Sequence, residues 1–328
     1  MSFAGGGTDV PPFVEREGGL VLSATISRYA YGTLRPRSDR DITIESLDFG
    51  LELRFGANDP ITFNGELDLI KAAIVRLGDR ETQGFDLFLH STAPLGSGLG
   101  ASSAMMVALV GLLKEFHGLA LTDYEIAHSA YLLERKELGL KGGMQDQYAA
   151  TFGGFNFIEF RGDRVIVNPL RVDADIVKEL EQNLLLGYTG FARSSDRIIE
   201  DQTSRFEDGD SRALEALRIQ KELAVEMKNA LLQGQLNTFG ELLGSAWEYK
   251  KRMSPKISTA FIDEVYSEAL EHGALGGKVT GAGGGGHMLF YCDYQSKHKV
   301  AEALTRMGVT VTDFAFEKDG LSTWRASA

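Results

Sequence analysis

The sequence predicts an α+β fold of mixed α/β type, in which strands and helices alternate along most of the chain. Two patterns support this prediction: runs rich in β-branched and aromatic residues, typical of strands, and longer runs with apolar residues at helical spacing. The composition agrees, because 43% hydrophobic and 24% charged residues are ordinary for a globular domain. A length of 328 residues favours two domains, and we expect them to span residues 1–170 and 171–328.

The first half of the chain is expected to contain both kinds of element. Residues 19–34 are rich in β-branched and aromatic residues, which predicts a strand or a bent pair of strands. Residues 66–78 show helical periodicity and end at Gly78, a residue type that often follows the last helical turn. Residues 102–118 are apolar on nearly every side, which predicts a buried helix. The other expected elements are strands at 42–46, 51–55, 84–91, 155–160 and 164–170, and a helix at 123–139.

The second half is expected to be richer in helices. Residues 183–190 contain a continuous apolar run, which predicts a buried strand. Helical periodicity then predicts three successive helices. The expected elements are helices at 195–206, 211–233, 236–248, 258–272 and 296–307, and strands at 275–280, 287–292 and 309–317.

Net charge and cysteine content exclude several classes of protein. The net charge of −12 and an isoelectric point near 5.1 argue against nucleic-acid binding, which needs a basic surface. No window approaches eighteen uninterrupted apolar residues, so we expect no membrane span. The one cysteine, Cys292, allows no intrachain disulfide, and no signal-peptide pattern begins the sequence, so we expect a cytoplasmic protein. The oligomeric state is left open, with a homo-oligomer among the options.

The stretch PLGSGLGASSA, residues 94–104, joins an expected strand to the expected buried helix. Three glycines alternate in it, and Ser102 and Ser103 follow. The first turn of a helix carries unpaired N–H groups and the positive end of the helix dipole, and glycines before it let a phosphate reach these donors. A glycine-rich turn with a serine cap is the alternative. The two serines and the strand–loop–helix context favour the phosphate site.

Two common nucleotide-binding motifs do not fit the sequence. The letters GSGLGA match the dinucleotide pattern formally, but the acidic residue at the required spacing, Glu115, lies at the end of an expected helix and not of a strand. The letters GAGGGGHM, residues 281–288, have Walker A glycine spacing. His287 and Met288 replace the lysine and the hydroxyl residue of that motif. We therefore reject both motifs.

Two further glycine loops carry candidate ligand contacts. The stretch FAGGGTDV, residues 3–10, places Thr8 and Asp9 after three glycines. A hydroxyl and a carboxylate suit a polyol, whose hydroxyl protons the aspartate can accept, although a turn with an Asx cap is an equal alternative. The stretch KVTGAGGGGHMLFY, residues 278–291, joins two expected strands, and its four consecutive glycines exceed what a short hairpin needs. Apolar strands on both sides disfavour a flexible linker.

In their order along the chain, FAGGGTDVPPF, PLGSGLGASSA and KVTGAGGGGHM resemble the three signature motifs of the GHMP small-molecule kinases. The resemblance spans nearly the whole chain. GGMQDQYAATFGG, residues 142–154, is similar to the branch of sugar anomeric kinases that includes the D-glycero-D-manno-heptose 7-phosphate kinases. The resemblance implies the two-domain GHMP kinase fold: an N-terminal ATP-binding domain like domain 2 of ribosomal protein S5, a ferredoxin-like C-terminal domain, and an active site between them.

The resemblance also implies ATP and Mg²⁺ as cofactors and assigns their ligands. Ser102 takes the position of the metal- and phosphate-binding serine, and Glu134 that of the second Mg²⁺ ligand, with a solvated residue of the ERKE run as its alternative. Asp146 matches the catalytic aspartate, which would take or orient the proton of the acceptor hydroxyl. An aspartate favoured by the helix dipole is its alternative. The residues expected to wrap the triphosphate are Gly96, Ser97, Gly98, Leu99, Gly100, Ala101, Ser102 and Ser103.

The sugar phosphate is expected near Arg193, which precedes an expected helix and can hold a phosphate through two parallel hydrogen bonds. A solvated arginine beside a serine cap is an equal alternative. The resemblance implies phosphoryl transfer to the anomeric hydroxyl of D-glycero-D-manno-heptose 7-phosphate, which gives the 1,7-bisphosphate, a precursor of activated heptose for surface polysaccharide. Another GHMP sugar kinase, of L-fucose or galactose type, and a non-catalytic sensor are the alternatives. The expected substrate-binding residues are Gly6, Gly7, Thr8, Asp9, Gly143, Arg193, Gly283 and Gly284.

Overall fold

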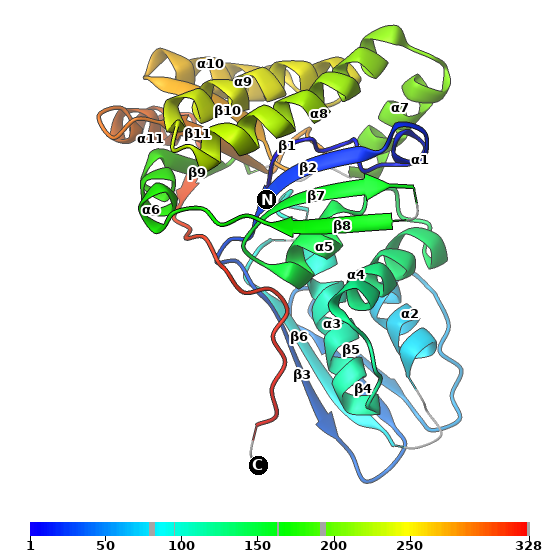
Figure 1. Ribbon diagram of the computed structural model, residues 1–328. Coiled ribbons are helices and arrows are strands. Elements are labelled where there is room, and N and C mark those ends of the chain that lie inside the picture. Colours follow the sequence, from blue (N-terminus) through cyan, green and yellow to red (C-terminus); the bar gives the residue numbers. More distant parts are fainter. Residues whose placement is uncertain (79–82, 95, 163, 191–194, 327–328) are drawn as a thin grey trace.

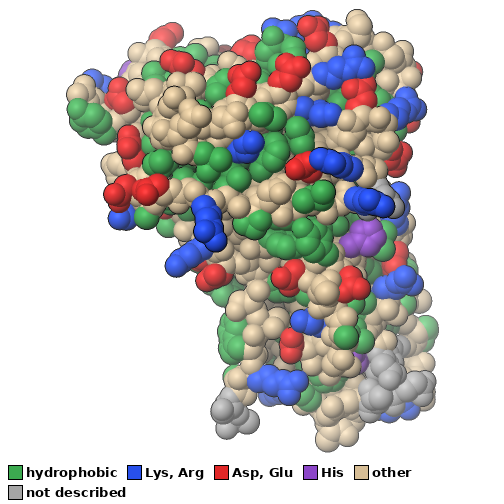
Figure 2. All heavy atoms as spheres, viewed as in Figure 1, with side chains coloured by type: hydrophobic (Ala, Val, Ile, Leu, Met, Phe, Trp, Pro, Cys, Tyr) green, Lys and Arg blue, Asp and Glu red, His purple; other side chains and the backbone are tan. Residues whose placement is uncertain are grey.

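The computed structural model describes residues 1–78, 83–94, 96–162, 164–190 and 195–326 (Figure 1). Within these residues the strands form three four-stranded sheets, and the helices pack between and around them. The predicted α+β class is therefore confirmed. On the face shown in Figure 2, the described Lys and Arg side chains are interspersed with Asp and Glu and form no continuous basic surface. None of the described helices has the length and apolarity that a membrane crossing requires.

The first sheet is antiparallel and has the strand order β1-β2-β7-β8. Its side chains alternate between two faces, as the pleat of a strand requires. Phe3, Leu22 and Phe157 on one face pack against Met227 and Phe239 of the helices above, so this face shares a core with the C-terminal half. The strands are β1 (Ser2–Ala4), β2 (Gly19–Ala24), β7 (Phe155–Arg161) and β8 (Arg164–Pro169).

The second sheet has the order β3-β6-β4-β5, and its central strands β4 and β6 are parallel. Ile44 and Leu87 on its inner face pack against Ile74 and Leu109 of the helices that cover it. Of the two alternatives predicted for residues 19–34, a strand or a bent pair of strands, the structure has two strands, and they lie in different sheets: β2 in the first and β3 in the second. The strands are β3 (Ala30–Pro36), β4 (Ile42–Ser46), β5 (Leu51–Phe55) and β6 (Phe85–Ser91).

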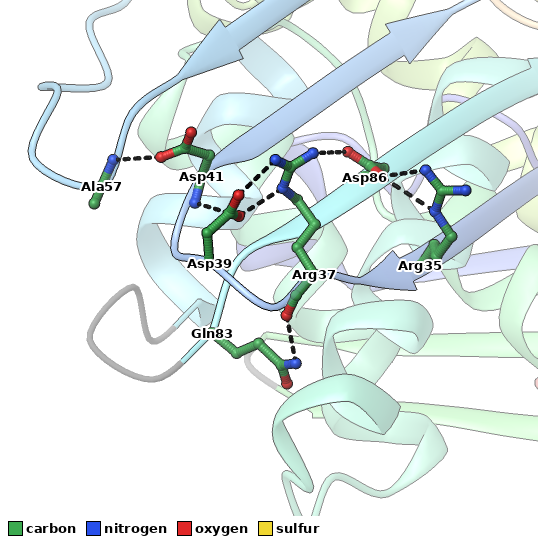
Figure 3. Close-up of polar contacts among 7 residues, drawn as sticks. All are labelled: Arg35, Arg37, Asp39, Asp41, Ala57, Gln83 and Asp86. Atoms are coloured by element: carbon green, nitrogen blue, oxygen red, sulfur yellow. Dashed lines mark hydrogen bonds and ion pairs between the residues drawn. The ribbon is translucent and has the colours of Figure 1, made fainter.

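The outer face of the second sheet carries a cluster of ion pairs (Figure 3). Asp86 accepts hydrogen bonds from Arg35 Nη2 at 2.7 Å and from Arg37 Nη1 at 2.9 Å, and Arg37 also binds Asp39. Arg35, opposed by burial, lowers the pKa of the Asp86 carboxyl. The charges of this cluster pair with one another, so we assign it a structural role.

The third sheet is antiparallel and has the order β10-β11-β9-β12. Counted along the chain, the order of the four strands is 2-3-1-4, which is the ferredoxin-like arrangement predicted for the C-terminal half. The helices between its first two strands are more numerous than the single helix of the simplest such fold. The strands are β9 (Leu184–Tyr188), β10 (Ala274–Val279), β11 (His287–Cys292) and β12 (Thr310–Thr312).

The predicted helices are present, mostly within a few residues of the expected ends, and three short helices were not predicted. The expected helix at 123–139 changes at its end into a π-helical segment, Leu133–Glu137, a feature often found at functional sites. The unpredicted helices are α1 (Phe13–Glu17), α5 (Gln145–Phe152) and α6 (Ala174–Asn183). The others are α2 (Asp68–Leu77), α3 (Ala101–His117), α4 (Asp123–Leu132), α7 (Ser195–Glu207), α8 (Ser211–Leu232), α9 (Leu236–Met253), α10 (Ala260–Glu271) and α11 (Lys297–Arg306).

The C-terminal segment leaves the third sheet and returns to the N-terminal half (Figure 1). The predicted strand at 309–317 is wrong beyond Thr312, because the described chain then crosses to the residues that follow β2 and forms a bridge between Phe316 and Ile26. Further along, Leu321 N donates to the Thr151 carbonyl oxygen at 3.0 Å. The strands of the first two sheets all precede residue 170 and those of the third follow it, and a domain boundary there remains a proposal.

Candidate active site

The three glycine loops are joined by close contacts. A methyl group built on Gly98 would lie 2.9 Å from the Thr280 carbonyl oxygen, and one built on Gly281 would lie 2.9 Å from Gly98 Cα. The second and third loops therefore touch through their backbones, which a side chain at either glycine would force apart. The first loop lies at the end of α9, since a methyl on Gly7 would lie 3.4 Å from Met253 Sδ.

The second loop leads into α3 without a side-chain cap. Gly100 is the N-cap residue, with a φ of 76°, and neither serine after it caps the helix. The first N–H groups of a helix have no partner within it and favour anions. The backbone of residues 96–103 therefore has the character expected of a phosphate cradle. Its role in binding ATP remains a prediction.

The carbonyl oxygen of Ser97 anchors the second loop to β11. His287 N donates to it at 3.0 Å, and His287 Nδ1 lies 3.0 Å from the same oxygen. Burial, opposed by the ring contact, lowers the pKa of the His287 imidazole, and a neutral ring with its proton on Nδ1 fits that ring contact. The residue that occupies the Walker lysine position thus holds the loop and not a phosphate. Within the described chain the buried Ser97 hydroxyl has no hydrogen-bond partner.

The Glu134 carboxylate lies beside the start of α3. Ser102 Oγ donates to Glu134 Oε1 at 3.0 Å, and Ser103 Oγ donates to Oε2 at 2.8 Å. The Gln147 amide also donates to Oε2. Glu134 is 1% exposed, so it is a buried residue of this cluster and not a solvated member of a charge run. The structure thereby brings together the two predicted Mg²⁺ ligands.

Asp146 stands in the first turn of α5, next to the second glycine loop. A methyl group on Gly100 would lie 3.2 Å from the Asp146 Cγ, so the carboxylate directly faces the mouth of α3. Asp146 is partly exposed, as a group that meets a substrate must be. The predicted catalytic aspartate and the predicted phosphate loop are therefore neighbours.

Asp9 brings a second carboxylate to this place. It is fully buried and accepts N–H bonds from Gly7 at 3.1 Å and from Gln145 at 2.9 Å. A side chain on Gly143 would overlap the Asp9 carboxylate, which explains that glycine. Burial raises the pKa of Asp9, and the charge of Asp146 raises it further, whereas the N–H bond from Gln145 opposes them.

The other predicted substrate residues differ in what they offer. The Thr8 hydroxyl is buried and used within the protein, where it donates to Gly5 O at 2.7 Å and accepts from Leu20 N at 3.1 Å. Thr8 therefore shapes the first loop. Gly6 lies beside Ser2, because a methyl group built on Gly6 would lie 3.4 Å from the Ser2 Oγ.

The third loop contacts the segment that follows α9. Gly284 N donates to the Ile257 carbonyl oxygen at 2.7 Å, and a methyl on Gly283 would lie 2.8 Å from the same oxygen. These two glycines therefore serve backbone packing in the structure. Arg193, predicted to bind the sugar phosphate, lies outside the described residues.

Two buried lysines near this site were not predicted. Lys250 on α9 donates to the Gly281 carbonyl oxygen, and Lys278 on β10 donates to Ser2 O at 2.8 Å and to Phe3 O at 3.1 Å. Burial lowers the pKa of Lys250 to about 8, whereas Asp9 and Asp146 act to raise it. The sequence pattern that could have indicated Lys278 is a lysine inside an apolar strand before a glycine loop. For Lys250 the available pattern is its three-residue spacing from Trp247, which places both on one face of a helix.

Two family models match this chain: the GHMP kinases N terminal domain over residues 68–154 and the GHMP kinases C terminal model over residues 227–310. A D-glycero-alpha-D-manno-heptose 7-phosphate kinase from Campylobacter jejuni is 40% identical over 329 residues, which cover 99% of this chain and 96% of the relative. The chain belongs to the GHMP kinases. The family predicted from the three glycine loops is confirmed.

Two further matches to this GHMP kinase are a sugar phosphate kinase and a protein with a fucokinase activity. A solved structure of a D-glycero-D-manno-heptose 1-phosphate kinase from Bacteroides thetaiotaomicron has a TM-score of 0.84 and 36% identity, covering 100% of this chain and 97% of that one. A bifunctional fucokinase/GDP-fucose pyrophosphorylase from Arabidopsis thaliana is 30% identical over 318 residues, 91% of this chain and 30% of that protein. The two-domain GHMP kinase fold is thereby confirmed.

Proposed function

We propose that this GHMP kinase transfers the γ-phosphoryl group of ATP to the anomeric hydroxyl of D-glycero-D-manno-heptose 7-phosphate, giving the 1,7-bisphosphate. One observation carries the proposal. Asp146 lies against Gly100 at the uncapped start of α3, in a chain that is 40% identical over nearly its full length to a heptose 7-phosphate kinase. A carboxylate beside a phosphate cradle is the arrangement that transfer to a hydroxyl needs.

The backbone of residues 96–103 would hold the triphosphate of ATP. Phosphoryl transfer depends mainly on positioning and on neutralising charge, and the N–H groups at a helix start provide both. The contacts of Ser97 with His287 and of Gly98 with Thr280 support a fixed loop. A cradle held before ATP arrives need not be ordered at the moment of binding.

Mg²⁺ fits the residues at the start of α3. Ser102 and Glu134 offer a hydroxyl and a carboxylate that touch at 3.0 Å, and hard oxygen atoms are the ligands that Mg²⁺ prefers. One or two protein ligands suffice, because phosphates and waters complete the coordination. Ser103 and Gln147 hold the other carboxylate oxygen and so orient Glu134. When bound, the ion would neutralise phosphate charge.

Asp146 would act on the acceptor. Its carboxylate can accept the hydrogen bond of the anomeric hydroxyl and direct that oxygen toward the phosphoryl group, and it can take the proton as the new bond forms. Asp9, buried beside it, is held by N–H groups from Gly7 and Gln145. We assign Asp9 to holding the first loop against α5, where the sugar would bind.

The test is an ADP-release screen across heptoses, hexoses and their terminal phosphates, with NMR of the product. We expect ADP release with the heptose 7-phosphate, and a sugar product that carries a new phosphate at C1. L-Fucose is the second candidate acceptor, since the fucokinase-containing relative matches 91% of the chain. Faster turnover of L-fucose would reject the heptose assignment. Binding of ATP and sugar without ADP release would indicate a sensor.

A further inference from the structure

Lys250 occupies a position unusual for a lysine. It lies between Trp247 and Met253 at three-residue spacing, on the face of α9 that is turned to the protein interior. Its side chain is 4% exposed, and both neighbours on that face are fully buried. Met253 packs beside Gly7 of the first glycine loop. Lys250 therefore points toward the site where the loops meet.

The ammonium group of Lys250 has more donors than partners. A lysine ammonium carries three N–H donors. Among the described residues, the hydrogen-bond acceptor that Lys250 reaches is Gly281 O, in the loop that touches Gly98. Two donors thus remain. A buried charged group with unused donors is costly unless a ligand completes its contacts.

The charges around Lys250 are those of the candidate site. Asp9 and Asp146 favour its charged form, although burial has the larger effect. Lys278 lies close enough for the charge of Lys250 to lower its pKa, after burial as the main cause. Lys278 already donates to the carbonyl groups of Ser2 and Phe3. Among the described residues, Lys250 therefore keeps two unused donors and Lys278 one.

We propose that Lys250 is a catalytic residue that donates a hydrogen bond to the γ-phosphoryl group during its transfer from ATP. The Gly281 contact fixes the ammonium beside the second loop, and Asp146, which also lies against that loop, aims the acceptor oxygen. Negative charge gathers on the phosphoryl oxygens during transfer, and a fixed cation in a buried site stabilises it strongly. This inference rests on the proposed use of ATP and is independent of which sugar accepts the group.

The test compares ADP with a non-hydrolysable ATP analogue, each with Mg²⁺ and without sugar, by isothermal titration calorimetry. Lys250→Met is expected to weaken binding of the ATP analogue by about 10-fold or more, which is the effect of one charged hydrogen bond. The affinity for ADP should stay within about 2-fold. Its kcat should fall by about 10²–10³-fold. Lys251→Met is the matched control, because Lys251 is the next residue and pairs with Glu248 on the surface.

Lys250→Gln separates a charge effect from a packing effect. Glutamine keeps N–H donors and most of the side-chain volume but has no charge, so it should lose the preference for the analogue as Lys250→Met does. Equal weakening of ADP and analogue in both variants, or unchanged binding of both, would overturn the proposal. Retained ADP affinity reports that each variant is folded. If the heptose screen fails while the analogue preference still depends on Lys250, the sugar assignment alone is wrong.

Discussion

Ser102 donates a hydrogen bond to Glu134 across 32 positions of sequence, at a distance of 3.0 Å. The contact joins the first turn of α3 to the π-helical segment after α4. The extra residue in a π-helical turn changes the direction of the side chains around it, and here Glu134 is buried against the start of α3. The predicted Mg²⁺ ligands are thus positioned by two helices that pack together.

Glu134→Gln should raise the Mg²⁺ concentration needed for activity by about 10- to 100-fold. The amide removes the charge, and its NH₂ group cannot accept from Gln147, which donates to the carboxylate. ADP release measured over a series of Mg²⁺ concentrations gives the shift. Glu137→Gln is the control, because Glu137 is 36% exposed and makes a surface pair with Arg76 at 3.5 Å, which contributes little. An equal Mg²⁺ dependence in both variants would remove Glu134 from the metal site.

Asp146→Asn should reduce kcat by about 10²–10⁴-fold, the usual loss for a general base. The KM for ATP should stay within about 2-fold, since loss of an interaction made in the transition state leaves ground-state binding intact. Steady-state kinetics with ATP and sugar varied separately distinguish the two effects. Turnover equal to that of the unmodified enzyme would show that Asp146 has no role in the reaction.

The glycine loops could be interpreted from sequence because their chemistry is local. Alternating glycines before a helix expose backbone donors wherever the loop lies, so a phosphate cradle at residues 96–103 could be predicted without knowledge of the tertiary structure. Thr8 is different: its hydroxyl is turned inward to Gly5 and Leu20, which only the folded loop reveals. Lys250 is different too, because its burial comes from the packing of α9 against the first and third loops.

The fold shows the same division between local and tertiary information. Long periodic helices such as α3 and α8 were predicted almost to their ends. Residues 313–317 alternate in the manner of a strand, but after Thr312 the chain has one bridge, between Phe316 and Ile26. Alternation indicates an extended chain with one buried face, and it does not say whether a strand partner exists. Whether an extended segment pairs as a strand depends on other segments that are distant in sequence, such as the residues around Ile26.

Gly100→Ala and Gly118→Ala form a matched pair at the two ends of α3. Both glycines have left-handed φ values, 76° and 65°, so alanine should cost about 1–2 kcal/mol of stability at either site. A methyl on Gly118 meets nothing within 4 Å, whereas one on Gly100 lies 3.2 Å from Asp146 Cγ. We expect similar losses in urea unfolding but a kcat loss of about 10-fold or more in Gly100→Ala alone. Comparable kcat values in the two variants would contradict the placement of Asp146.

The pH dependence of Lys250 is expected to act in opposite directions on stability and on activity. Burial lowers its pKa from the ordinary 10.5 to about 8 in the folded protein. Between these values the unfolded chain binds the proton more tightly, so the contribution of Lys250 to stability rises with pH. Activity should instead fall above pH 8, because the neutral amine loses the charge that meets the phosphoryl group.

Profiles of kcat/KM for ATP and of urea unfolding between pH 7 and 10 test this, with Lys250→Met as the comparison. Asp9, Asp146 and Lys278 face the same site and remain in both proteins, so the difference between the profiles isolates Lys250. In Lys250→Met we expect the residual activity to show no loss above pH 8. We also expect its free energy of unfolding to lack the increase with pH that Lys250 gives the unmodified protein. An alkaline limb that survives unchanged in Lys250→Met belongs to another group, and Lys250 would then have no charge-dependent part in the transfer.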